Sequence, residues 1–337
     1  MPEPSRSTAE PIDIVPGALD DEREAVADDG VVTPAEAIAV EEVEEVELLG
    51  ASAAAPVMAA SPVKGKRRFG PFFWLAVAWL VVLTALAVLA PVLPFVDSPK
   101  ELFPEAFRTS PSAEHWFGGD AIGRDLFARV IYGARVSLTV GVASIGIGLA
   151  IGGTLGLIAG HFRGAVDTVI TSAANIMLAF PSLILALALV SFMGQNLRNV
   201  ILALAILSIP RLLRITRAAT MTFSQREFVT ASRTLGASHW RVITREVLPN
   251  VVPPMMSFAL LAIAVVIVAE GALSFLGLSV EAPTASWGGI INEGRDLLDE
   301  APHISLIPCA VMFVTLLSLN YVGDKLRQIW DVREIRL

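Results

Sequence analysis

The chain has 337 residues, of which 54% are hydrophobic and only 17% are charged, and its mean hydropathy is +0.64. This balance excludes an ordinary soluble domain and is typical of a polytopic membrane protein. The formal net charge of −8 is unevenly distributed, because residues 1–63 hold 15 acidic and 2 basic residues while residues 64–337 hold 18 acidic and 23 basic residues. The single cysteine, Cys309, excludes an internal disulfide and is interpreted as a small core residue.

The first 63 residues form an acidic segment rich in Glu, Ala, Pro and Val. Acidic residues stand where a signal peptide would carry a positive charge, so we expect no signal peptide here. The low content of large apolar residues and the high charge predict a disordered cytoplasmic tail. No residue pattern in this tail identifies a binding partner.

Residues 64–337 are predicted to form one all-α membrane domain with six transmembrane helices. The apolar runs place these spans at about 71–96, 136–160, 165–193, 200–221, 251–280 and 303–322. The segments assigned to the inside hold 16 Lys and Arg residues, and those assigned to the outside hold 7. This bias predicts that both termini lie in the cytoplasm.

Three local patterns refine these spans. Leu126, Val130 and Ile131, with arginines around them, predict a short amphipathic helix on the outer surface before the second span. Pro181 is expected to kink the third span. Four glycines in the second span recur at every fourth position and predict a smooth ridge for close helix packing, namely Gly148, Gly152, Gly156 and Gly160.

A polar, basic segment at 224–250 interrupts the apolar runs. Ser224 and Glu227 have the spacing of a capping box, which predicts a helix running to Leu235 and broken by Gly236. A second helix is predicted over 238–247, with Trp240, Ile243 and Val247 on one stripe and Arg241 and Arg245 on another, and Leu248-Pro249 is expected to end it. Two short helices of this kind are marginal alone in water, so we expect them to dock on another protein.

This segment resembles the EAA loop of ABC importer permeases. The matching residues are the small triplet Thr230-Ala231-Ser232, then Gly236, then the ending Val247-Leu248-Pro249. From about residue 70 onwards the chain is similar to the dipeptide, oligopeptide and nickel permease family, and best to its C-type subunit. The supporting stretches, in order, are FGGDAIGRDLFARVIYGARVSL, LAFPSLILAL, RITRAA, EGALSFLGL and PTASWG.

The resemblance implies a type I ABC importer permease fold and a role in moving peptides into the cytoplasm through a bacterial cell membrane. It implies four partners: a sister permease in a heterodimer, two ATPase subunits and an extracytoplasmic binding protein. The chain lacks a GxxxxGK[ST] phosphate loop, so ATP hydrolysis is assigned to the ATPase chains and no cofactor or nucleic acid is expected. The residues expected to couple to the ATPases are Glu227, Thr230, Ala231, Ser232, Leu235, Gly236, Ala237, Leu248 and Pro249.

The chain departs from the family pattern at several positions. Gly119 stands where Thr is usual, Thr230 where Glu is usual and Val332 where Pro is common. Ser172 and Asn175 replace an Arg and an Asp, and losing both avoids leaving one charge unpaired in lipid, so tighter and more apolar packing is predicted there.

Glu270, in the fifth span, is either a gating or cavity residue or a structural hydrogen-bonding group. Asp167 is expected to favour a helix N-terminus at the inner face. His115 and His161 have no second ligand at metal-binding spacing, so no metal site is predicted.

Functions other than that of a peptide importer permease would require other sequence features. Nickel or another small solute is the alternative substrate. An intramembrane enzyme would need a nucleophile–base pair or HExxH in its spans, and none is found. A channel would need neither the polar segment nor partner subunits.

Overall fold

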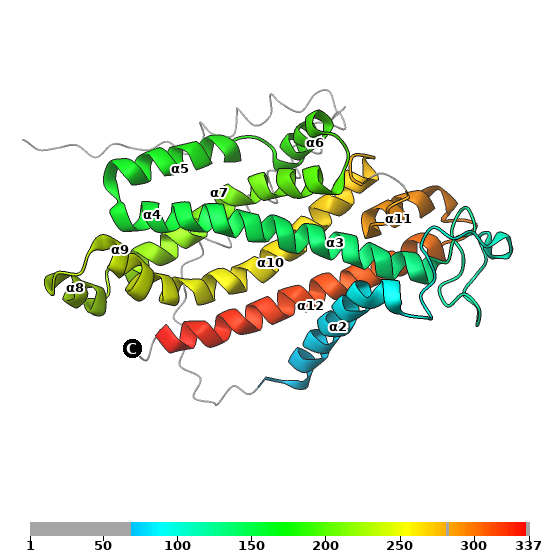
Figure 1. The fold of residues 1–337 in the computed structure, drawn as a ribbon, viewed down its shortest axis with the longest axis horizontal. Coiled ribbons are helices and arrows are strands. Elements are labelled where there is room, and N and C mark those ends of the chain that lie inside the picture. Colours follow the sequence, from blue (N-terminus) through cyan, green and yellow to red (C-terminus); the bar gives the residue numbers. More distant parts are fainter. Residues whose placement is uncertain (1–68, 281–282, 335–337) are drawn as a thin grey trace, which may run out of the picture. The chain divides into compact units, whose positions relative to one another are not determined.

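The computed structural model describes residues 69–280 and 283–334, with side chains up to residue 330. The acidic tail at 1–63 and the side chain of Val332 therefore lie outside the described residues. The described chain is built from helices, and its only β-type pairing is an isolated bridge between Gly119 and Asp125. This architecture agrees with the all-α membrane fold predicted from the sequence (Figure 1).

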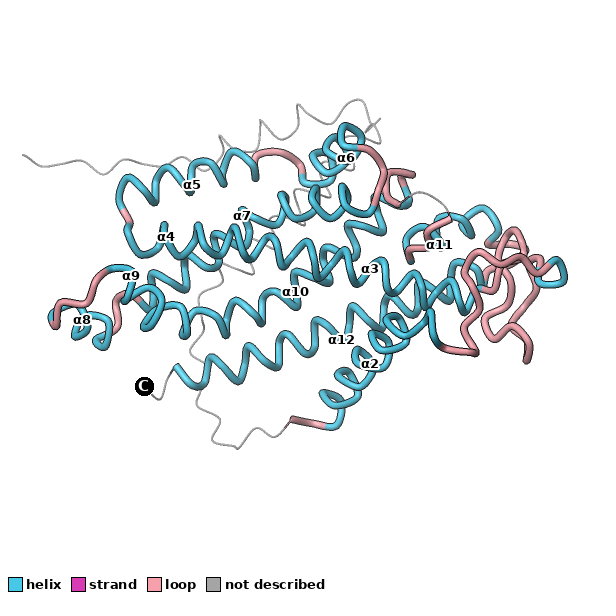
Figure 2. The backbone as a smooth tube through the Cα atoms, viewed as in Figure 1, coloured by secondary structure: helices cyan, strands magenta, loops and turns pink. Residues whose placement is uncertain are grey.

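Long helices make up most of the described chain (Figure 2). Their bounds are α2 Pro71–Leu89, α3 Leu126–Gly148, α4 Thr154–Phe162, α5 Gly164–Leu178, α6 Ser182–Met193, α7 Leu197–Phe223, α10 Leu248–Phe275 and α12 His303–Glu334. Shorter helices are α8 Glu227–Thr234, α9 His239–Arg241 and α11 Trp287–Gly294. Single 3₁₀ turns lie at Ala90–Val92, Pro104–Ala106 and Arg295–Leu297, and π-helical turns lie at Leu149–Gly153 and Val242–Val247.

Five of the described helical stretches are long and apolar enough to cross a membrane, and a sixth is added if α5 and α6 together form one span. Two of them are much longer than a bilayer requires, because π turns join α3 to α4 and α9 to α10 into continuous stretches, Leu126–Phe162 and His239–Phe275. We call the end of the bundle that carries α8 and α9 the α8 end, and the opposite end the α11 end (Figure 1).

The predicted surface helix before the second span is wrong. Leu126, Val130 and Ile131 instead form the first turns of α3, and all three side chains are buried. Asp125 caps this helix, since its carboxylate accepts a hydrogen bond from the Ala128 N–H at 2.7 Å. The apolar spacing that suggested an amphipathic surface helix comes from the buried face of a longer helix. This helix has packing partners on more than one side.

The predicted kink at Pro181 is a full break. The structure bends by 85° between α5 and α6, and Pro181, the N-cap residue of α6, is non-helical with φ −54° and ψ 122°. Proline has no N–H to donate, and it disfavours helical conformation in the residue before it, which explains why the helix stops there.

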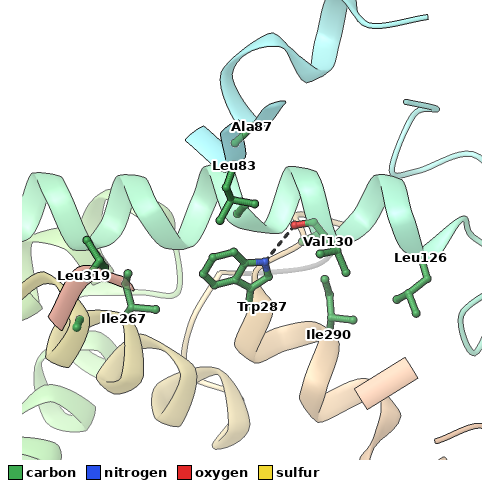
Figure 3. Close-up of a cluster of buried hydrophobic side chains, with 11 residues drawn as sticks. Leu83, Ala87, Leu126, Val130, Ile267, Trp287, Ile290 and Leu319 are labelled. Atoms are coloured by element: carbon green, nitrogen blue, oxygen red, sulfur yellow. Dashed lines mark hydrogen bonds between the residues drawn. The ribbon is translucent and has the colours of Figure 1, made fainter. Parts of the chain in front are cut away.

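Trp287 is the centre of the largest apolar core at the α11 end. Its side chain is fully buried among residues of α2, α3, α10 and α12, including Leu83, Leu126 and Ile267 (Figure 3). The indole N–H donates to the Val130 carbonyl at 3.1 Å, so the one polar group of the ring is satisfied. Because α11 begins at this residue, the core fixes α11 against α3.

Candidate functional site

The 224–250 loop at the α8 end contains two short helices that meet at Gly236. The backbone of Gly236 has φ +81°, and no heavy atom would lie within 4 Å of an added Cβ. Only glycine adopts this conformation without strain, so the bend depends on backbone freedom and not on tight packing. The predicted glycine break between the two helices is therefore confirmed.

The start of the first helix differs from the prediction. Arg226 is the N-cap residue of α8, no side chain caps it, and the buried Ser224 hydroxyl has no hydrogen-bond partner. Ser224 instead ends α7, where its N–H donates to the Thr220 carbonyl at 2.9 Å. The capping-box spacing was thus correct for a helix start nearby but wrong for the capping group.

The second helix does not end at Leu248-Pro249. Ser238 caps α9, a π turn follows, and the helix continues without interruption into α10. Pro249 closely follows the π turn, where the regular i→i−4 hydrogen-bond pattern is already interrupted, and this accommodates a residue without an N–H. The π turn also shifts the helical period, so Ile243 and Val247 are buried as expected while Trp240 is 72% exposed.

Most of the predicted coupling residues face outwards. Leu235 is the most prominent, with 89% of its surface exposed at the tip of the loop. Glu227, Thr230, Ala231, Gly236 and Pro249 are also exposed, and Ser232, Ala237 and Leu248 are half-buried. A small apolar core of Phe223, Val229, Val242, Val247 and Val251 holds the loop from beneath.

Two exposed arginines lie on the second helix of the loop. Arg241 and Arg245 line a shallow pocket of about 330 Å³ together with Ser238, Trp240 and Thr244. Both arginines are exposed, and neither makes an ion pair within the described part of the chain. The pocket therefore offers guanidinium groups, hydroxyls and an aromatic edge to a ligand or partner.

A pair of histidines joins the loop to the end of α4. His161 Nε2 and His239 Nδ1 lie 3.1 Å apart, and the two rings meet edge to face. Sequence spacing gives neither His161 nor His115 a partner, but each has one in the structure. The Nδ1 atom of His115 lies 3.0 Å from the Asp125 carboxylate. Across the described residues, no three His, Cys, Asp or Glu side chains are grouped to hold a metal ion.

The four spaced glycines lie along α7. A Cβ on Gly152 would come within 2.5 Å of the Ile209 carbonyl oxygen, and one on Gly156 would come within 2.6 Å of the Leu213 oxygen. Gly148 and Gly160 meet the same helix at Leu212 and Arg217. The long α3–α4 helix and α7 therefore touch backbone to backbone, a contact that any larger residue would separate.

Two polar contacts join α5 to α7. Arg217 forms a two-point ion pair with Asp167 in the first turn of α5, with distances of 2.5 and 2.6 Å. Arg214 donates to the Asn175 side-chain oxygen at 2.8 Å. Ser172 and Asn175 are both exposed, so the prediction of tighter apolar packing there is wrong for this chain by itself.

Glu270 is fully buried and accepts three hydrogen bonds. The donors are the hydroxyls of Ser137 on α3, Ser274 on α10 and Ser279 beyond it, at 3.1, 2.9 and 2.9 Å. The Ser137 hydroxyl also accepts a hydrogen bond from the backbone N–H of Trp287 at 3.3 Å. This geometry matches the structural alternative for Glu270, since its carboxylate ties α3 and α10 to the segment before α11.

The α11 end contains a buried ionic cluster to which the sequence analysis gave no role. Arg129 and Arg124 both contact Asp120 and Glu293, with distances between 2.5 and 2.9 Å. Burial acts to raise the pKa of Asp120, but N–H groups of Arg124 and Ile122 and the two guanidinium groups outweigh it and lower that pKa. The repeated charges within GGDAIGRDLFAR are the one feature of the sequence that could have indicated this cluster. The participation of Glu293 could not be predicted from local spacing, because this residue is distant in sequence.

Comparisons with known proteins place this geometry in context. The family described as "Binding-protein-dependent transport system inner membrane component" matches residues 152–334. The glutathione transport system permease protein GsiD of Pectobacterium atrosepticum is 36% identical over 75% of this chain and 84% of its own length. The dipeptide transport system permease protein DppC of Alkalihalophilus pseudofirmus is 38% identical over 76% of this chain and 85% of its own length.

Solved structures support the same fold. Two inward-facing crystal forms of the MetNI methionine ABC transporter match with TM-scores of 0.52 and 0.53 at 16% identity. The matches cover 60% and 61% of this chain and 96% and 97% of the solved chains. At this identity the likeness concerns the arrangement of helices alone.

Proposed function

Because the chain belongs to the family of binding-protein-dependent transport system inner membrane components, we propose that it is the permease subunit of an ATP-driven peptide importer. Its own role is translocation, and partner chains hydrolyse ATP. The glutathione and dipeptide transport relatives favour small peptides as the substrate. Nickel or another small solute is the alternative within the same family.

The observation that carries this proposal is the exposed 224–250 loop. Leu235 and Trp240 present large apolar side chains to solvent, beside arginines with no ion pair of their own in the described residues. A surface of this kind is unfavourable in water unless a partner covers it. We assign that partner as an ATPase subunit, with a second ATPase bound to a sister permease of similar fold.

This assignment orients the protein in the membrane. The ATPases lie in the cytoplasm, so the α8 end faces the cytoplasm and the α11 end faces outwards, towards a substrate-binding protein. The seven arginines between residues 211 and 245 favour this orientation. Both termini then lie on the cytoplasmic side.

Movement of the loop can pass directly into the membrane domain. The α9 helix continues through a π turn into α10, so displacement of the loop tilts a single 37-residue stretch. Closure of two ATPases would pull on two such loops and switch the permease pair between inward-facing and outward-facing states. This is a rigid-body, two-state mechanism in which ATP binding favours one state.

Two loop variants test the coupling. Gly236→Pro forces φ from +81° to about −65°, and Leu235→Asp places a charge at the apolar tip. Either change is expected to uncouple ATP hydrolysis from uptake without changing membrane insertion. Gly146→Ala, in α3 with open space around its Cβ position, is the matched control and should keep normal uptake. Normal uptake in both loop variants would refute the docking role.

A transport assay tests the substrate. Uptake of labelled dipeptides, longer peptides, glutathione and nickel would be compared between a deletion strain and the same strain carrying this chain. We expect restored uptake of a peptide. Restoration of nickel uptake alone would replace the peptide proposal with the alternative.

A further inference from the structure

The histidine pair is a direct side-chain bond between the 224–250 loop and the α3–α4 helix. His161 is in the last turn of α4, and His239 is the first residue of α9. The Phe162 ring packs against His239 with centroids 5.6 Å apart, so the contact includes both bonding and packing. Above this point, α4 lies against α7 through the glycine ridge. The histidine pair is therefore a contact through which a displacement of the loop would also displace the α3–α4 helix.

The surroundings assign the proton between the two rings. The Nδ1 atom of His161 is buried and has no hydrogen-bond partner, so a proton there would be a buried donor without an acceptor. His161 therefore carries its proton on Nε2 and donates it to His239 Nδ1. Burial and the neighbouring guanidinium groups of Arg233 and Arg163 all oppose a second proton on the His161 ring. The bond thus requires an unprotonated Nδ1 on His239.

We propose that the His161–His239 hydrogen bond positions the 224–250 loop against α4 and passes loop movement to it only while the accepting imidazole is neutral. This inference rests on the proposed coupling role of the loop. A proton on the accepting imidazole nitrogen would occupy the lone pair that this bond uses, and imidazoles as a class change charge between about pH 5 and 8. Acidification of the loop side therefore favours separation of the two rings.

The test measures substrate imported per ATP hydrolysed in vesicles that contain the complete importer, with the pH of the ATPase side varied from 8 to 5.5. For the wild type this ratio should fall as the pH falls. His161→Phe keeps an aromatic ring without the donor, and it should give a low ratio at every pH. The paired change His161→Gln with His239→Asn restores an amide hydrogen bond that does not titrate, and it should give a high, pH-independent ratio.

His303→Gln is the matched control, because this histidine bonds a backbone carbonyl, that of Gly119, at the α11 end. It should reproduce the wild-type ratio and pH profile. A wild-type profile in His161→Phe, or a ratio in the paired variant as low as in His161→Phe, would overturn the inference. Absence of ATP-driven uptake by the wild-type chain at every pH would instead contradict the proposed function, so the two failures are distinguishable.

Discussion

The two ends of the bundle differ in the ion pairs and hydrogen bonds that their side chains find within the chain. At the α11 end, Arg124 and Arg129 pair with the buried carboxylate of Asp120, Trp287 is enclosed, and Glu270 accepts hydrogen bonds from three hydroxyl groups. At the α8 end, Leu235 and Trp240 are exposed, and Arg241 and Arg245 have no ion pair in the described chain. The buried arginines at the α11 end therefore find their ion pairs within the chain, whereas the α8 end carries the loop at which we propose that a partner binds. Mutations should separate the two by affecting stability at one end and coupling at the other.

The largest loss of stability is expected from Asp120→Ala. This change removes the one buried carboxylate that Arg124 and Arg129 share, leaves them only the partly exposed Glu293, and removes the acceptor for two backbone N–H groups. Removing one partner of a buried ionic cluster costs roughly 3–5 kcal/mol. The measurement is thermal unfolding of the detergent-purified chain. Glu300→Gln, in the exposed pair with Arg108, is the control and should change stability by less than about 1 kcal/mol.

The same cluster predicts how stability depends on pH. Because the pKa of Asp120 is lowered from 3.8 in the folded state, its contribution is fully present above pH 3.8. This contribution decreases as the pH falls below 3.8, because the unfolded state then binds the proton more readily than the folded state does. It is fully lost once the pH is below the lowered pKa of Asp120 in the folded state. Wild type should lose stability in this acid window more steeply than Asp120→Asn. Equal slopes in the two proteins would show that Asp120 does not carry this dependence.

An intermediate effect is expected along the glycine ridge, which links the two ends. Gly152→Ala would place a Cβ 2.5 Å from the Ile209 carbonyl oxygen, and backbone atoms cannot turn aside as a side chain can. Overpacking of this kind costs roughly 1–3 kcal/mol. Gly146→Ala in the same long helix meets open space and should be neutral or stabilising by up to about 1 kcal/mol. Thermal unfolding of the two variants gives the comparison directly, and equal stability would mean that the ridge is not a close contact.

Sequence patterns predicted these two ends unequally well. Apolar length located the long helices, and the φ of Gly236 is the one a helix-breaking glycine needs. The sequence patterns failed where a residue packs against, or pairs with, residues that are distant from it in the sequence. Leu126 and Val130 looked amphipathic because only one helical face was considered, and the π turn at 242–247 moved Trp240 off the apolar stripe. Arg129 and Glu293 are distant in sequence, so no local spacing could pair them.

The smallest effect on stability, and the sharpest test of the difference between the ends, is expected from Arg241→Ala combined with Arg245→Ala. Both side chains are exposed, so unfolding should change by no more than about 0.5 kcal/mol. A partner that places carboxylates in the Arg241–Arg245 pocket would nevertheless lose charge-assisted bonds, and its recovery by copurification should fall most at low salt. Arg198→Ala, an exposed arginine at the start of α7, is the matched control and should leave recovery unchanged. If the double variant lost stability as Asp120→Ala does while recovery held, the arginines would belong to the structure of the chain and the partner surface would lie elsewhere on the loop.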